Sequence, residues 1–392
     1  MGKIKFLIGT FRGGGAERVI SNLAYALEDK FETEIVLYGK NAVIEYDYVG
    51  KLSYLDKDSS ENLLKRICSF LKRVRKIKVD KKKDDVIYIS FLTMPNIINV
   101  LANKDQKTII SVRNYTSLEL KGNIVLNFLV SNFYKKADKI IANSEMMKKD
   151  LVEKYNISSD KVKVIYNSYP ISKIESLSKM EIENKYKAIF ENPVIITAGR
   201  LNDQKGQWHL IRAFKKVKQF HKNAKLVLLG KGELMDYLTE LSKDLGLVND
   251  IHFLGFTENP FKYVSKSTVF AFSSLFEGFP NALAEAMVCN IPIVSADCLS
   301  GPREILAPLE VHELNFNYEN NIKRHGILFP VPDGIKHSAN VALTSEEDIM
   351  ANKLIEVLGS KDVREHYAKK AKKRIQDFEI ENIIKEWLNI LE

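Results

Sequence analysis

The sequence predicts an α/β protein of two domains, each built on a parallel sheet with helices on both faces. Three observations lead to this fold class. The chain has 392 residues, more than a single hydrophobic core usually supports. Short apolar runs rich in β-branched residues alternate with longer segments of helical periodicity, which is typical of βαβ units. Polarity rises over residues 168–193, with proline near both ends. We therefore expect a domain boundary there, with a hinge that lets the two domains face each other across a cleft.

The apolar runs are the predicted strands, because strands buried on both faces of a parallel sheet form continuous apolar runs. In the first half of the chain they are residues 3–9, 33–38, 85–91, 107–113, 139–144 and 161–167. In the second half they are residues 193–199, 225–230, 251–256, 268–274, 291–297 and 325–330. Six runs in each half predict two similar sheets. Residues 378–391 have the period of a single amphipathic helix.

The composition and the cysteine pattern predict a cytoplasmic globular protein. Hydrophobic residues make up 45% of the chain and charged residues 28%, which is ordinary for a folded protein. Cys68, Cys289 and Cys298 are too few and too scattered for a disulfide framework. The first apolar run is too short for a signal peptide, and no later run is long enough to span a bilayer. The histidines are scattered as well, so we expect neither a zinc site nor a Ser-His-Asp hydrolase.

The net charge of +9 is concentrated in the first half of the chain. Residues 61–83 carry ten basic and two acidic residues, and apolar residues recur there at helical spacing over 64–79. Such a helix can pack on the core with a solvated charged face, lie on an anionic membrane surface through residues 64–83, or contact nucleic acid. Charge patterning alone does not distinguish these three interpretations.

A glycine-rich turn follows the first predicted strand. Gly14 and Gly15 precede a helix that is expected to begin near Ala16, so backbone N–H groups at the helix start can face an anion such as phosphate. Arg18 stands where a dinucleotide-binding fingerprint needs its third glycine, and no Gly-Lys-Ser/Thr follows, so the Rossmann and Walker motifs are both excluded. The alternative is that the glycines only let the strand and the helix pack closely.

Two cations follow the first strand of the second half. Arg200 and Lys205 bracket a polar loop at the carboxyl end of this strand, where open α/β sheets bind ligands. Together they can neutralise a diphosphate leaving group. The alternative is a pair of solvated loop cations.

Two glutamates lie eight residues apart in "SSLFEGFPNALAEAMVCN", residues 273–290. A strand, a turn and a helix are predicted there, with Pro280 at the first helical position. Glu277 then precedes the helix, and Glu285 shares a helix face with Asn281 and can accept two vicinal ribose hydroxyls. Backbone donors from Gly278 to Leu283 remain free for sugar or phosphate oxygens. The alternative makes Glu285 a partner of the helix dipole and Glu277 an exposed carboxylate.

Taken together, these stretches resemble the retaining glycosyltransferase family 4 of the GT-B fold, in which Glu277 and Glu285 match the E-x7-E motif. The match runs from residue 2 to beyond residue 330. It includes "GGGAERV", "ANS", "VIYNS", "AGRLNDQKG", "LLGKGEL", "FLGFTENP" and "SGPREIL". The stretches "GGGAERV" and "SGPREIL" look most like those of bacterial enzymes that build capsule, lipopolysaccharide core or lipid-linked oligosaccharides.

The resemblance implies a role for each domain and for the residues of the site. Residues 1–170, with about 376–392 crossing back as the terminal helix, would bind the acceptor, and residues 190–375 would bind the nucleotide sugar. Glu277, Arg200 and Lys205 would be catalytic. The donor would contact Gly14, Gly15, Gly255, Phe256, Gly278, Phe279, Pro280, Asn281, Ala282, Leu283 and Glu285.

This chain departs from the family pattern at two places. Many relatives carry a histidine near the reacting sugar, where this chain offers Arg113 and Asn114 on the acceptor side. Relatives also have glycine after the motif helix, where this chain has Asn290. Asparagine tolerates the left-handed conformation that a helix cap needs, so we expect the turn to survive.

The function expected from the resemblance is transfer of a hexose or N-acetylhexosamine, with retention, from a nucleotide diphosphate sugar. The expected donor is a UDP-sugar and the acceptor a glycan, lipid-linked through polyprenyl diphosphate. Neither a cofactor nor a metal ion is expected. Residues 64–83 would hold the enzyme on the inner face of the plasma membrane. The alternatives are a sugar-nucleotide epimerase of the same architecture and a basic nucleic-acid-binding protein.

Overall fold

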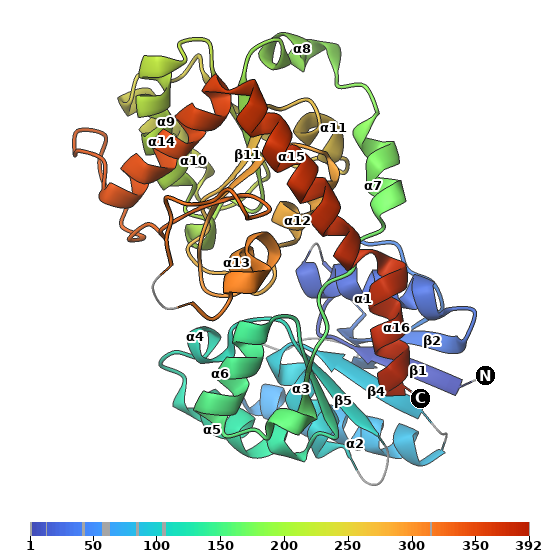
Figure 1. Cartoon of the computed structure of the whole chain (residues 1–392). Helices are drawn as coiled ribbons and strands as arrows, with labels where there is room; N and C mark the ends of the chain where they lie inside the picture. Colours follow the sequence, from blue (N-terminus) through green and yellow to red (C-terminus); the bar gives the residue numbers. More distant parts are fainter. Residues whose placement is uncertain are drawn as a thin grey trace. The chain divides into compact units, whose positions relative to one another are not determined.

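The computed structural model describes residues 2–12, 14–40, 44–56, 63–83, 86–103, 107–313 and 316–391. The chain forms two compact units. Unit 1 consists of Met1–Tyr169 and Phe378–Glu392, and unit 2 is Pro170–Asp377. Figure 1 shows that each unit contains its own sheet with helices around it.

Unit 1 is built on a sheet of seven parallel strands in the order β3-β2-β1-β4-β5-β6-β7. The strands are β1 (Gly2–Leu7), β2 (Phe31–Gly39), β3 (Lys51–Asp56), β4 (Val86–Phe91), β5 (Thr108–Val112), β6 (Lys139–Ala142) and β7 (Val162–Val164). Its helices are α1 (Gly15–Leu27), α2 (Leu63–Lys83), α3 (Thr93–Leu101), α4 (Thr116–Glu119), α5 (Ile124–Phe133), α6 (Glu145–Tyr155) and α16 (Ile380–Leu391).

The prediction of six strands in the first half was wrong, because β3 is a seventh strand. It pairs in parallel with β2 at one edge of the sheet. All six of its residues are at least partly exposed. An edge strand of this kind is not buried on both faces, so "KLSYLD" lacks the continuous apolar run by which the other strands were recognised.

The C-terminal helix α16 belongs to unit 1, as expected, although the preceding α15 lies in unit 2. It contacts α1, and both helices are visible side by side in Figure 1. Trp387 on α16 is buried and stacks on Phe91 at the end of β4, with 6.5 Å between ring centroids. The last turns of the chain therefore complete the core that begins with β1.

Helix α2 carries the basic segment, and its apolar stripe is only partly covered. Ile77 is fully buried, whereas Ile67 and Leu71 are 50% and 61% exposed. The side chains of residues 64, 82 and 83, which belong to the predicted segment, lie outside the described part of the chain. No helix among the described residues is long and apolar enough to cross a membrane.

Unit 2 is built on a sheet of six parallel strands in the order β10-β9-β8-β11-β12-β13. All six lie within the predicted runs: β8 (Val194–Ala198), β9 (Lys225–Leu229), β10 (Ile251–Gly255), β11 (Val269–Phe272), β12 (Ile293–Ala296) and β13 (Ile327–Phe329). The helices are α7 (Ile171–Ser178), α8 (Asn184–Phe190), α9 (Gln207–Phe220), α10 (Met235–Asp244), α11 (Phe261–Val264), α12 (Asn281–Val288), α13 (Pro302–Leu306), α14 (Ser345–Gly359) and α15 (Lys361–Ile375).

A buried polar cluster ties α9 to α14 in unit 2. Arg212 donates from Nε to both carboxylate oxygens of Glu347, at 2.9 and 3.1 Å, and its other nitrogens donate to backbone carbonyls. The ring of His209 contacts the same carboxylate at 2.8 Å. Every nitrogen of Arg212 is thus satisfied, as a buried guanidinium requires.

Candidate active site

The strand order of unit 2 reverses between β8 and β11, which lie side by side while their connections lead in opposite directions. In open α/β sheets, ligands bind outside the carboxyl ends of the strands at such a switch point. Two loops meet there. The first, residues 199–206, follows β8, and the second, residues 273–280, follows β11.

Backbone and side-chain hydrogen bonds fasten the two loops together. The Leu275 N–H donates to the Gln204 carbonyl at 2.8 Å, and the Gln204 amide donates to the Phe276 carbonyl at 2.9 Å. The Ser273 hydroxyl donates to the Lys205 carbonyl at 3.0 Å. Gly206 has a φ of 56°, and a Cβ there would lie 2.6 Å from the Ser273 carbonyl oxygen. The approach of the loops therefore requires glycine at this position.

Lys205 and Glu277 form an ion pair between these loops, with 2.5 Å from Nζ to Oε1. Glu277 is only 8% exposed, so the alternative in which it is an exposed carboxylate is wrong. The Lys205 ammonium also lies 5.3 Å from the centre of the Phe272 ring. The pair thus places one positive and one negative group, both partly desolvated, at the switch point, where their electrostatic effect on a bound ligand is stronger than in water.

Arg200 lies on the same loop as Lys205, but its side chain is exposed. Within the described part of the chain it makes no ion pair. The backbone beside it is tightly packed, because a Cβ at Gly230 would lie 1.9 Å from the Gly199 carbonyl oxygen. The loop is therefore fixed while the guanidinium is available to a ligand.

The turn before α12 differs in detail from the prediction. Pro280 is the N-cap, with φ −75° and ψ 103°, and Asn281 is the first helical residue. The prediction of Pro280 at the first helical position was therefore wrong by one residue, because its ψ is extended rather than helical. No side chain caps this helix start. Backbone N–H groups of its first turn, such as those of Ala282 and Leu283, are candidates for binding oxygen atoms.

The loop between β12 and α13 supports this turn, and sequence reasoning missed its role. The Ser300 hydroxyl donates to the Gly278 carbonyl at 2.7 Å. Gly301, with a φ of 73°, approaches so closely that a Cβ would lie 2.4 Å from Pro280 Cδ. The motif "SGPREIL" marks this loop in the sequence, but nothing in its letters shows which turn it contacts.

The other predicted donor-binding residues occupy the same end of the sheet. Glu285 lies on α12 and is 8% exposed. Gly255 ends β10 with a φ of 77°, and open space lies where its Cβ would be. Phe256 is 67% exposed, with the Lys231 ammonium 5.2 Å from its ring centre. After α12, Asn290 has a φ of 57°, which confirms the expected left-handed turn.

Cys298 lies beside this pair and is an unreactive thiol. It is fully buried, and that burial, together with the carboxylate of Glu277, raises the pKa of Cys298 well above its usual range. The side chain therefore stays protonated and does not act as a nucleophile.

In unit 1 the predicted residues lie at the carboxyl ends of β1 and β5. Gly14 is the N-cap of α1 and Gly15 its first residue, and a Cβ at Gly14 would lie 2.2 Å from a carboxylate oxygen of Glu17. Gly14 thus leaves room for this carboxylate. Arg113 follows β5 and is 7% exposed, whereas Asn114 is exposed and hydrogen-bonds Glu119.

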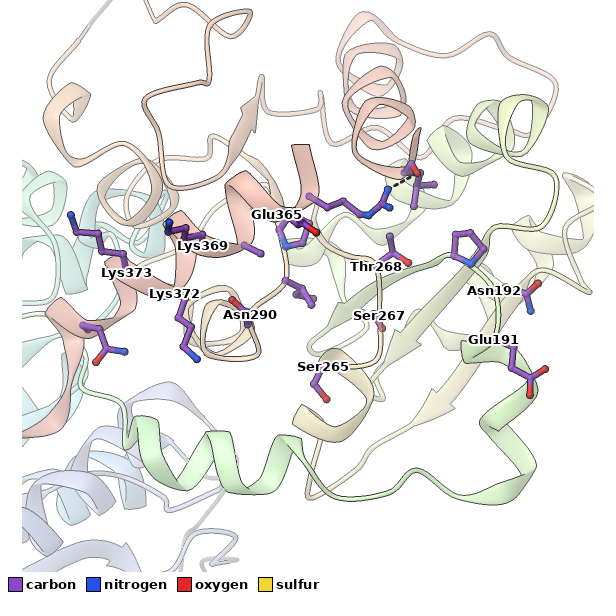
Figure 2. Close-up of a pocket in the computed structure, with 17 residues that line it drawn as sticks. Glu191, Asn192, Ser265, Ser267, Thr268, Asn290, Glu365, Lys369, Lys372 and Lys373 are labelled. Carbon is purple, nitrogen blue, oxygen red and sulfur yellow. Dashed lines mark hydrogen bonds between the residues drawn. The ribbon is translucent and has the colours of Figure 1, made fainter. Parts of the chain in front are cut away.

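A cavity of about 1090 Å³ lies at the amino ends of strands of the unit 2 sheet, opposite the carboxyl ends described above (Figure 2). Pro193, Thr268 and Pro292, which line it, directly precede β8, β11 and β12. Figure 2 shows Lys369, Lys372 and Lys373 of α15 along one side. Because the cavity borders the amino ends of the strands, it takes no part in the site around Lys205 and Glu277.

The fold is shared with several solved structures. The structure of Anabaena HepE in complex with UDP matches with a TM-score of 0.76 at 20% identity, covering 99% of both chains. The apo form of the lipopolysaccharide outer core galactosyltransferase WaaB matches with a TM-score of 0.69 at 21% identity, again covering 99% of both. Two parallel-sheet units of this kind define the class of the protein by its fold, the GT-B fold.

Sequence comparison gives the family within this class. Residues 178–374 match the family model of glycosyl transferases group 1, and residues 13–173 match that of glycosyltransferase family 4. An uncharacterized glycosyltransferase of Methanocaldococcus jannaschii is 37% identical over 84% of this chain and 83% of its own length. A Campylobacter jejuni N-acetylgalactosaminyltransferase, named for a diphospho-undecaprenol-linked acceptor, is 33% identical over 78% and 83%. The chain belongs to the glycosyltransferase family that these models describe, as its motifs predicted.

Proposed function

We propose that this glycosyltransferase moves a hexose or N-acetylhexosamine from a UDP-sugar to a glycan acceptor and retains the anomeric configuration. The observation that carries the proposal is the Lys205–Glu277 ion pair at the switch point of unit 2. The UDP named in the HepE structure and the lipid-linked acceptor named for the Campylobacter relative support the choice of substrates. By the same argument, the acceptor is a polyprenyl-diphosphate-linked glycan of surface polysaccharide synthesis.

The charged residues have separate roles in this reaction. As the bond between the anomeric carbon and the diphosphate oxygen breaks, Lys205 and Arg200 stabilise the negative charge that develops on the diphosphate. Glu277 orients the sugar and opposes the positive charge on its ring. Glu285 accepts the ribose hydroxyls, and the N–H groups at the start of α12 hold sugar and phosphate oxygens.

The anomeric configuration is retained because the diphosphate departs before the acceptor attacks. The acceptor hydroxyl oxygen forms its bond to the anomeric carbon on the face that the diphosphate leaves, and its proton passes to a phosphate oxygen of the leaving group. Atoms and charge balance without a cofactor. On this proposal the two cations take the place of a divalent metal ion as counter-charge.

A direct assay tests the proposal. The purified chain is incubated with UDP-sugars in turn, and thermal unfolding is followed, because a ligand that binds only the folded state raises the unfolding temperature. The stabilising donor is then offered to glycan acceptors and the product linkage determined by NMR. Transfer with retention supports the proposal, and inversion contradicts it. Conversion of the donor sugar without transfer would favour the epimerase, which the relatives named above do not support.

We further propose that α2 holds the enzyme on an anionic membrane surface near its acceptor. Ile67 and Leu71 are half exposed or more, beside exposed Lys65, Arg66 and Lys72. Exposed apolar side chains flanked by cations suit a headgroup boundary. Co-sedimentation with phosphatidylglycerol vesicles tests this, with a variant that replaces the three cations by glutamate. Equal pelleting of both proteins would rule it out, and a gel-shift assay checks the nucleic-acid alternative.

A further inference from the structure

Arg113 lies at the carboxyl end of β5 in unit 1, where two contacts fix its side chain. Its Nη1 donates to Asn167 Oδ1 at 2.9 Å, and its guanidinium carbon lies 5.2 Å from the centre of the Phe91 ring. Only 7% of the residue is exposed. The guanidinium is therefore buried and held in one orientation.

The other edge of this guanidinium has no partner. Nε and Nη2 of Arg113 are both buried, and neither makes a hydrogen bond within the described part of the chain. No ion pair there involves Arg113 either. The N–H groups of Nε and Nη2 point the same way and form the fork that binds a carboxylate or a phosphate with two parallel hydrogen bonds. Arg212, which is equally buried, has every nitrogen satisfied.

Two other residues at the carboxyl end of this sheet also have unusual environments. Asn143 directly follows β6, is 2% exposed, and has an Oδ1 without a hydrogen-bond partner among the described residues. Leu92 directly follows β4 and has φ 73° and ψ 162°, a strained conformation for a residue with a side chain. Because the three residues directly follow the adjacent parallel strands β4, β5 and β6, all of them lie at the carboxyl end of the sheet.

A buried cation without a counter-charge is unfavourable, and proteins pair such groups or use them to bind ligands. Burial lowers the pKa of Arg113 to about 9, so the side chain is still a cation at neutral pH. An oxyanion on the free edge would supply both the missing charge and the missing acceptors.

We propose that Arg113 is an oxyanion-binding residue of unit 1, and that the substrate it holds carries a phosphate or carboxylate group. Asn143 Oδ1 accepts a hydrogen bond from a hydroxyl of the same molecule. This deepens the proposed function, on which it rests for the identity of the ligand as a substrate. The diphosphate of a lipid-linked acceptor and the carboxylate of an acidic sugar share this chemistry.

Calorimetric titration of the full-length chain tests the proposal independently of sugar transfer. The titration uses the Arg200→Ala/Lys205→Met/Glu277→Gln variant, in which the cations assigned to the donor diphosphate in unit 2 are removed and no buried carboxylate is left unpaired. Sodium pyrophosphate and sodium glucuronate are the probes, and glucose is the neutral control. We expect one probe to bind, and Arg113→Met to weaken that binding about tenfold to a hundredfold, the loss of a charged hydrogen-bonded pair. Lys121→Met, which removes an exposed cation of the same unit, should leave binding unchanged.

The result distinguishes the two ligand sources, and one set of results would refute the proposal. Binding of pyrophosphate alone indicates a diphosphate, and binding of glucuronate alone indicates an acidic sugar. If neither probe binds, or if Arg113→Met binds as well as its parent, the proposal is wrong, whatever the transfer assay shows. A thermal scan without ligand excludes a merely structural role. We expect the unfolding temperature of Arg113→Met to equal or exceed that of wild type, and a marked decrease would contradict the proposal.

Discussion

At the scale of single residues, the Lys205–Glu277 ion pair joins two loops, and its two residues are 72 positions apart in the chain. Each charge is the counter-charge of the other, which offsets part of the cost of removing both groups from water and holds them in place. On the proposed function, a bound diphosphate would compete for the ammonium while the carboxylate stayed beside the sugar. We expect this exchange of partners to distinguish the pair from a purely structural salt bridge.

The pair predicts a separation of activity from stability. Glu277→Gln should lower kcat about a hundredfold, comparable to the loss of one group that stabilises transition-state charge. Lys205→Met alone should also destabilise the fold, because it leaves a buried carboxylate unpaired. The double variant Lys205→Met/Glu277→Gln should regain stability but not activity. Urea unfolding and steady-state kinetics measure the two effects, and a double variant that transfers sugar at the wild-type rate would refute the assignment.

Lys81, near the end of α2, predicts a pH effect on stability in unit 1. Burial lowers the pKa of Lys81 to about 8, and its ammonium donates to the Thr108 hydroxyl at 3.1 Å. The folded state therefore releases this proton before the unfolded state does. Stability linked to Lys81 must rise as pH increases from about 8 toward the unfolded value near 10.5.

The variant Lys81→Met isolates this effect from other titrating groups. At pH 7 it should be more stable than wild type, and the difference should shrink by about 2 to 3 kcal/mol between pH 8 and pH 10.5. Urea unfolding at a series of pH values gives this difference directly. A difference that stays constant with pH would show that Lys81 does not titrate in this range.

At the scale of elements, the turn before α12 depends on the loop from β12 that packs beneath it. Gly301→Ala should destabilise the fold by more than its backbone conformation alone explains, because its Cβ would meet Pro280. Gly246→Ala is the matched control, since Gly246 has the same φ of 73° but open space around its Cβ. We expect Gly301→Ala also to weaken UDP binding and Gly246→Ala to leave it unchanged. Equal effects of the two substitutions would show that the contact does not position the turn.

Sequence patterns predicted most elements, and the exceptions have physical reasons. Buried parallel strands produce continuous apolar runs, so all six strands of unit 2 and six of the seven in unit 1 were found. Edge strand β3 produces no such run. Residue types at strand ends predicted Lys205 and Glu277, but no pattern shows that Gly301 supports Pro280 or that Arg113 has an unpaired edge. Contacts between distant loops depend on packing that sequence periodicity does not encode.

At the scale of the whole molecule, unit 1 is built from both ends of the chain. Trp387 near the C-terminus is buried in the same core as Phe6 in β1. Trp387→Ala should therefore destabilise the protein by about 3 to 5 kcal/mol, the usual effect of removing a large core aromatic. Lys385→Ala, on an exposed position of the same helix, should change stability little. Urea unfolding measures both variants. If Trp387→Ala leaves the stability unchanged, α16 is dispensable for unit 1.

A crystal structure with an intact UDP-sugar shows directly whether Lys205 and Glu277 hold the donor, and the same soak of Lys205→Met crystals supports it. We expect the diphosphate at about 3 Å from Lys205 Nζ, the ribose on Glu285 and the sugar beside Glu277. We also expect the variant to bind the donor more weakly. A donor bound away from the carboxyl ends of β8 and β11, with these side chains untouched, would contradict these expectations.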